Sequence, residues 1–111
     1  MAVRPLIYIA GPLTTGNQII NTNLANQAAA RLMRAGLAPF VPHNMILCEL
    51  VSPGPSYEEW LDLCLTYLSR CDALLRLPGE SPGADREVAF ARGLGIPVFT
   101  REEDLTAIRR G

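Results

Sequence analysis

The segment from Cys71 to Glu87, CDALLRLPGESPGADRE, brings a hydroxyl and a carboxylate together behind a short apolar run. The apolar run predicts a buried strand, and the proline and glycine residues after it predict a loop that opens onto a helix. Ser81, Gly83 and Glu87 would then lie near the carboxyl edge of a sheet, where open α/β sheets bind ligands. A carboxylate held there can act as a nucleophile or stabilise a developing positive charge.

Composition removes several other kinds of chemistry. All ten basic residues are arginines, so neither a Schiff-base lysine nor a Walker-type phosphate lysine is available. His43 is the single histidine, and the three cysteines lack CxxC spacing, which argues against a metal site or a disulfide framework. We therefore expect no metal, no cofactor and a cytoplasmic location. The net charge of −1 and the absence of a long apolar run argue against a nucleic-acid polymer or a membrane as partner.

Short apolar runs alternate with helical patterns along the chain, which predicts an α/β fold. We expect a single domain, 1–111, with a doubly wound, flavodoxin/Rossmann-like parallel sheet of four to five strands. Right-handed crossovers favour the strand order 2-1-3-4, with helices on both faces. The predicted strands cover residues 5–10, 38–41, 72–77 and 96–99.

The helices between these strands show capping and stop signals. Ile20, Leu24, Ala28 and Leu32 recur every four residues before Gly36, which predicts a helix of about four turns. The other predicted helices run from a capping box at Ser56 and Glu59 to near Arg70, over 85–94, and over a last turn or two at 102–109. Residues 45–56 contain SPGPS and little periodicity, so we interpret them as an active-site flap or an interface loop.

Two segments carry a motif. Residues 8–12 (YIAGP) lead out of the first strand and residues 81–87 (SPGADRE) follow the third. Together they resemble the nucleoside 2-deoxyribosyltransferase family and its nucleotide N-hydrolase relatives. The resemblance implies cleavage or transfer at the N-glycosidic bond of a (deoxy)nucleoside or nucleoside 5′-monophosphate. A glutamate nucleophile would form a glycosyl ester, which a second base or water resolves. It also implies homo-oligomers in which a neighbouring chain completes the pocket.

The resemblance assigns the catalytic pair. Glu87 matches the nucleophile, and Tyr8 matches the tyrosine that orients it. In the first turn of a helix, the macrodipole would favour the ionised form of Glu87. The alternatives are a plain helix N-terminal acid for Glu87 and a core aromatic for Tyr8.

Other polar residues at the same edge are candidate substrate ligands. Ser81 can donate to a sugar hydroxyl or a phosphate, Gly83 and Gly11 allow close approach to the backbone, and the loop holding Thr14 and Asn17 can cradle a sugar or phosphate. Ser81 and Gly83 can equally be plain turn residues. This loop contains no arginine, which favours nucleosides over monophosphates.

His43 could contact or protonate the base, but a lone histidine beside a proline is more often structural. Asp72 opens the third strand at the far edge, so we assign it no catalytic role.

One position departs from the family pattern. Family members often carry an aspartate eight residues before the position of Asp72, and Cys64 stands there. This leaves open a non-catalytic nucleotide-binding or nucleotide-sensing module of the same fold. A third possibility is an interaction protein whose helix at 56–70 pairs with a partner, since Trp60 and Tyr67 share one helix face.

Overall fold

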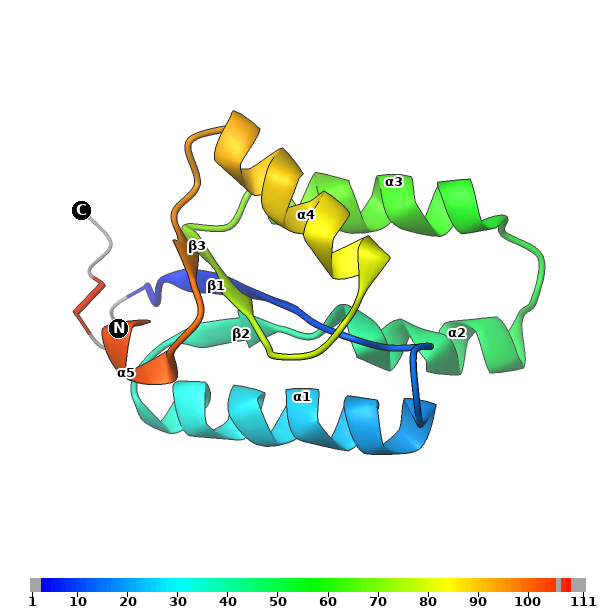
Figure 1. Ribbon diagram of the computed structural model, residues 1–111, viewed down its shortest axis with the longest axis horizontal. Coiled ribbons are helices and arrows are strands. Elements are labelled where there is room, and N and C mark those ends of the chain that lie inside the picture. Colours follow the sequence, from blue (N-terminus) through cyan, green and yellow to red (C-terminus); the bar gives the residue numbers. More distant parts are fainter. Residues whose placement is uncertain (1–2, 106, 109–111) are drawn as a thin grey trace.

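The structure, a computed structural model, describes residues 3–105 and 107–108. Its centre is a parallel sheet in the order β2-β1-β3-β4, which confirms the predicted topology (Figure 1). In the described residues the sheet has four strands, each within the range predicted for it. They are β1 (Leu6–Ala10), β2 (Ala38–Phe40), β3 (Ala73–Arg76) and β4 (Val98–Phe99).

Helices cover both faces of the sheet, as expected from the alternating pattern (Figure 1). On one face, α1 (Gln18–Arg34) and α5 (Glu102–Leu105) bury the side chains that alternate with Tyr8 along β1, namely Ile7 and Ile9. On the other face, α3 (Tyr57–Leu68) and α4 (Pro82–Gly93) pack over Tyr8, Ala10 and Leu74. Strand alternation therefore decides which residues can reach α3 and α4.

Local signals fix the start of α3. The Ser56 hydroxyl accepts a hydrogen bond from the Glu59 amide at 3.2 Å, and the Glu59 carboxylate accepts one from the Ser56 amide at 2.9 Å. This is the predicted capping box, and it satisfies two amides that a helix start otherwise leaves unpaired.

The segment 45–56 is not the loop that the sequence suggested. It continues a 3-10 turn, η1 (Pro42–Met45), into a short helix, α2 (Ile46–Val51), and only the residues around SPGPS form a loop. In the sequence ILCELV every residue but Glu49 is apolar, so there is no alternation of apolar and polar residues from which a helix could be predicted. In the structure Leu47, Leu50 and Val51 are exposed.

Two further helices differ in detail from their predictions. The buried stripe of α1 consists of Ala25, Ala28 and Leu32, while Ile20 and Leu24 are exposed. The last helix spans 102–105 of the predicted 102–109, and residues 106 and 109 lie outside the described part. Among the helices that the structure describes, none combines the length and apolar character needed to cross a membrane.

Candidate functional site

A tyrosine and a glutamate that are 79 residues apart in sequence meet beneath α4. Tyr8 is fully buried on β1, and its hydroxyl donates a hydrogen bond to Oε2 of Glu87. Burial and the neighbouring carboxylate raise the pKa of the Tyr8 hydroxyl far above its usual range, so Tyr8 stays protonated and acts as a donor. The structure thus brings together the two residues that the sequence paired as catalytic candidates.

The helix that carries Glu87 begins earlier than predicted, which changes the electrostatics of this carboxyl. Ser81 is the N-cap and Pro82 the first residue of α4, so Glu87 lies in the second turn. The expected help from the macrodipole does not apply there, because that effect fades beyond the first turn. Burial raises the pKa of Glu87, while the Tyr8 hydroxyl and the positive charge of Arg76 act in the opposite direction.

Cys64 on α3 forms the third side of this site. Its thiol interacts with the Tyr8 hydroxyl and lies within electrostatic reach of Glu87. Burial raises the pKa of the thiol, so Cys64 is a neutral group here. Cys64, at the position where the resemblance implies an aspartate, therefore lies close to Glu87 but contributes no charge.

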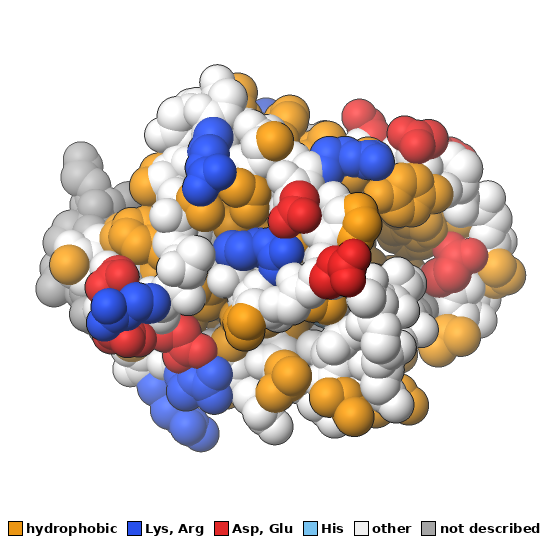
Figure 2. Space-filling model, viewed as in Figure 1, with side chains coloured by type: hydrophobic (Ala, Val, Ile, Leu, Met, Phe, Trp, Pro, Cys, Tyr) orange, Lys and Arg blue, Asp and Glu red, His pale blue; other side chains and the backbone are white. Residues whose placement is uncertain are grey.

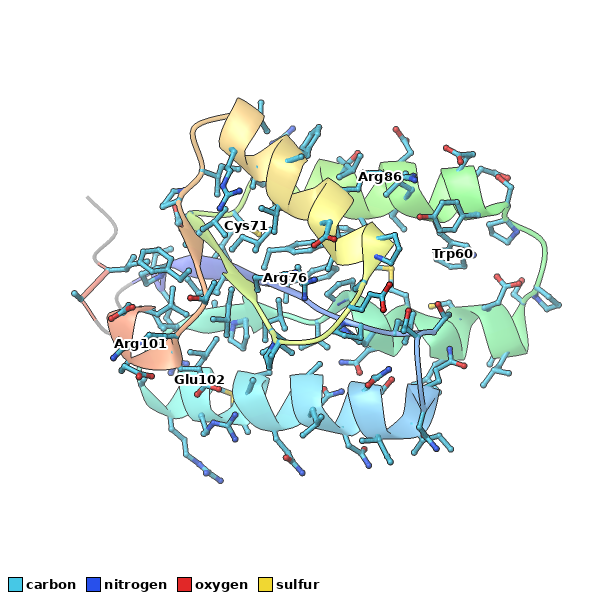
Figure 3. The ribbon with its side chains drawn as sticks, viewed as in Figure 1. Trp60, Cys71, Arg76, Arg86, Arg101 and Glu102 are labelled. Carbon is cyan, nitrogen blue, oxygen red and sulfur yellow. The ribbon has the colours of Figure 1, made fainter. Side chains whose placement is uncertain are left out.

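Trp60 lies one turn before Cys64 on the same face of α3, since residues four apart share a helix face. Its indole Nε1 donates to Oε2 of Glu49 at 2.8 Å, and Figure 3 shows the ring between α3 and α2. Trp60 therefore links α3 to α2 on the face of α3 that carries Cys64. The sequence had suggested a core or partner contact.

The loops after β1 and β3 touch through their glycines. A Cβ atom on buried Gly11 would lie 3.0 Å from Cβ of Leu77, and one on Gly79 would lie 2.8 Å from Cγ of Pro12. Gly79 also has φ +113°, a conformation that other residues rarely adopt. Gly11 therefore allows two protein loops to approach each other.

His43 is buried in η1 and linked to the same loop. Its Nε2 lies 3.1 Å from the Pro12 carbonyl oxygen, and its buried Nδ1 meets no hydrogen-bond geometry with any of the described residues. Burial lowers the pKa of His43, so the ring is neutral and Nε2–H can donate to that carbonyl. This contact matches the structural alternative, and a contact with substrate stays a prediction.

The remaining candidate ligands have defined local positions. The Ser81 hydroxyl caps α4 by accepting from the Ala84 amide at 3.0 Å, and Asn17 caps α1 by accepting from the Ile20 amide at 3.0 Å. Thr14 is exposed in the loop after β1, and open space surrounds the position of a Cβ on Gly83. Ser81 and Asn17 thus have structural roles, and substrate contact by any of these residues stays a prediction.

Arg76, which the sequence reasoning passed over, belongs to the site. It pairs with Ala10 in the β1–β3 register, two residues beyond the pair of Leu74 with Tyr8. Strand alternation therefore directs it to the α4 face, as Figure 3 shows. Counting this alternation from Tyr8 across the predicted register could have found it.

Asp72 lies at the opposite edge, where its Oδ2 accepts from the Leu6 amide at 2.7 Å. This agrees with its exclusion from the candidate catalytic groups. Within the described residues, no three His, Cys, Asp or Glu side chains gather as a metal site.

A protein-family model described as "Domain of unknown function (DUF4406)" matches residues 5–100. The chain belongs to the DUF4406 family. No curated protein sequence matches it significantly.

Solved structures connect this member of the DUF4406 family to a known architecture. A conserved protein from Enterococcus faecalis V583 superposes with a TM-score of 0.73 at 18% identity, over 86% of this chain and 62% of that one. The 2-deoxyribosyltransferase of Bacillus psychrosaccharolyticus gives 0.62 at 19% identity, over 94% and 92%. A 2-desoxiribosyltransferase from Leishmania mexicana gives 0.62 at 20% identity, over 85% and 61%.

These likenesses establish the fold, and they confirm the expected resemblance to 2-deoxyribosyltransferases at that level. The chain spans less than two thirds of the Enterococcus and Leishmania proteins.

Proposed function

We propose that this protein cleaves or transfers at the N-glycosidic bond of a (deoxy)nucleoside or its 5′-monophosphate, with Glu87 as the nucleophile. The hydrogen bond from Tyr8 to Glu87 carries the proposal. It joins β1 to α4, the helix that follows β3. β1 and β3 are neighbours in the sheet, and the chain leaves them toward opposite faces, which is the kind of point where α/β folds bind ligands. The proteins named 2-deoxyribosyltransferases share this fold, which supports the same class of reaction.

The two oxygens of the Glu87 carboxylate can have different roles in the proposed reaction. Tyr8 holds Oε2, so Oε1 is the oxygen that can approach C1′ of a sugar. A partly buried carboxylate is poorly solvated, which makes it more reactive toward a cationic centre. Its raised pKa also means that the reactive anion forms only above the usual pH range of a glutamate.

The proposed reaction has two displacements. Oε1 of Glu87 bonds to C1′ while the C1′–N bond breaks, and the departing base keeps the electron pair and takes a proton from solvent. Water or a second base then attacks C1′, and the ester C–O bond breaks to restore the carboxylate. Neutral His43, already bonded to Pro12, is better suited to holding the loop than to donating this proton.

A second candidate is a nucleotide-binding module that has kept the fold without the reaction. The neutral thiol of Cys64 beside Glu87 favours this candidate, because no second carboxylate is provided there. Such a module would still use the loop contacts among Gly11, Pro12 and Gly79 to shape a ligand site.

The test is incubation with ribo- and deoxyribonucleosides and their 5′-monophosphates, with and without an acceptor base, followed by chromatography of the released base. Glu87→Ala should abolish release, and intact-mass spectrometry should detect a glycosyl adduct in the wild type only. Glu80→Ala, which removes an exposed carboxylate from the loop before α4, is the matched control and should keep full activity. No turnover on any substrate refutes the enzyme. Saturable binding without product that survives Glu87→Ala supports the sensing module.

We also propose that the protein forms homo-oligomers through α2 and its surroundings. Val51 is 84% exposed and Leu50 is 73% exposed, an unusual state for aliphatic side chains on neighbouring positions of a helix. Figure 2 shows hydrophobic side chains spread along the lower edge and the right-hand side of the molecule. Besides Leu47, Leu50 and Val51 of α2, the exposed large apolar residues of α1 and α3 include Ile20, Leu24, Tyr57 and Tyr67.

Sedimentation velocity tests the oligomer. Leu50→Asp should shift the protein toward the monomer, whereas Leu94→Asp, at the far end of α4, should leave its state unchanged (Figure 1). A wild type that is monomeric at all concentrations contradicts the proposal. We further propose a protein that acts on small molecules in the cytoplasm, a location in keeping with its three unpaired cysteines.

A further inference from the structure

Arg76 is a largely buried cation with no part in the reaction described above. Only 15% of its side chain is exposed. Ala10, its partner in the β1–β3 register, is small, so the arginine side chain has room to lie over the sheet beneath α4. Buried arginines are costly unless they are fully bonded, so its partners indicate what it is for.

Those partners belong to the loop that leads to Glu87. The guanidinium donates to the carbonyl oxygen of Leu77, to that of Gly79 at 3.0 Å, and to Oδ1 of Asp85 at 3.0 Å. The loop between β3 and α4 is therefore wrapped around one planar group. It is also fixed from outside, where Gly79 packs against Pro12.

The same guanidinium lies on the face of the sheet that carries Tyr8, and its positive charge acts against the burial that raises the pKa of Glu87. The groups that interact with this carboxyl are Tyr8 from β1, Cys64 from α3 and Arg76 from β3. Tyr8 and Cys64 are neutral, so Arg76 is the one of these three that carries positive charge. On α4 itself, Asp85 and Arg86 are exposed, and Asp85 is paired with Arg76.

We propose that Arg76 is a positioning residue that holds the loop before α4 in place and keeps the Glu87 carboxylate ionised, without touching the substrate. This inference rests on the proposed role of Glu87 as nucleophile. Its two parts can be separated, because lysine keeps the charge of arginine but not its planar fork of donors.

The experiment compares Arg76→Met, Arg76→Lys and the control Arg86→Met. Arg86 is the exposed arginine beside Glu87 on α4, and its guanidinium carbon lies 5.8 Å from the centre of the Tyr57 ring (Figure 3). Two quantities are measured from about pH 5 to about pH 9: kcat/KM on the best substrate of the panel, and ionisation of Glu87 by side-chain carbon NMR. The Glu87 signal is assigned by its loss in Glu87→Gln.

In Arg76→Met we expect ionisation of Glu87 and the acid limb of kcat/KM to move together to higher pH. On that limb kcat/KM should fall about tenfold or more, the size of effect that a nearby opposite charge has on a carboxyl. Arg76→Lys should leave the ionisation close to wild type and lower kcat, and Arg86→Met should change neither.

The proposal is overturned if Glu87 ionises at the same pH in Arg76→Met as in the wild type. This holds even if the activity of Arg76→Met is lower by the same factor at all pH values. If circular dichroism shows that Arg76→Met is unfolded, Arg76→Lys decides: ionisation at the wild-type pH supports the role of the charge, and ionisation displaced to higher pH overturns it. The NMR titration does not need turnover. A wild type without activity would therefore refute the proposed function while the charge of Arg76 is still tested.

Discussion

Replacing Glu87 with glutamine should make the protein more stable at neutral pH. Glutamine keeps an oxygen that can accept from the Tyr8 hydroxyl and has nearly the same shape, but it cannot ionise. The wild type carries a partly buried carboxylate whose charged form is disfavoured by burial. Functional sites commonly reduce stability in this way, and relieving them typically gains about 0.5–2 kcal/mol.

The dependence on pH follows from the direction of the pKa shift. Burial raises the pKa of Glu87 in the folded protein above its usual value of 4.5, so the folded state binds this proton more tightly than the unfolded chain. The contribution of Glu87 to stability is therefore fully present below its usual pKa of 4.5 and is lost as the pH rises through the folded pKa. Each unit of difference costs about 1.4 kcal/mol once the group is ionised. Glu87→Gln lacks this loss. The free energy of unfolding of Glu87→Gln should therefore exceed that of the wild type only slightly near pH 4, and the difference should become constant above the folded pKa of Glu87.

Urea unfolding at a series of pH values measures this difference as the free energy of unfolding in water. The control is Glu80→Gln, which makes the same change of charge at an exposed loop position. Its profile should follow that of the wild type within about 0.5 kcal/mol. The reasoning fails if Glu87→Gln is no more stable than the wild type at pH 7.5, or if its advantage does not grow with pH.

Three further substitutions test the site and the fold. Tyr8→Phe removes the donor to Glu87 and should lower kcat/KM near neutral pH about ten- to a hundredfold. The acid limb of the pH profile should move to higher pH, because the hydrogen bond from Tyr8 lowers the pKa of Glu87. An acid limb at the wild-type pH would contradict this. Gly79→Ala should cost about 1–3 kcal/mol in urea unfolding, because φ is +113° and Pro12 is close. Gly83→Ala should gain up to about 1 kcal/mol, because a Cβ there points into open space on a helix. Equal effects would refute the close approach of Gly79 to Pro12. Ser56→Ala should lose about 1 kcal/mol in the same assay, and no loss would mean that the capping box contributes little.

The order of the sheet could be predicted because its causes are local and repeated. Short apolar strands alternate with helices, and right-handed crossovers leave few arrangements of such units. The cap at Ser56 was also predictable, since its two hydrogen bonds join residues only three apart. The short helix α2 escaped prediction, because its exposed apolar residues leave no period to read.

The start of α4 shows how a small local error reaches the chemistry. Placing it at 85 put Glu87 in the first turn, where the helix dipole would favour a carboxylate. With Ser81 as the cap, Glu87 instead lies one turn further on and faces the sheet. The expected effect on its pKa was therefore reversed by burial.

The sequence by itself determined the fold and the pairing of Tyr8 with Glu87, because residue types at fixed spacing record strands, caps and a family motif. Only the tertiary structure decided the environment of that pair: the neutral Cys64 thiol beside it, the Arg76 charge beneath α4, and the bond between His43 and the loop at Pro12. Ionisation depends on desolvation and on charges brought near through space. Both arise from packing between segments that are far apart in the chain, which no local pattern records.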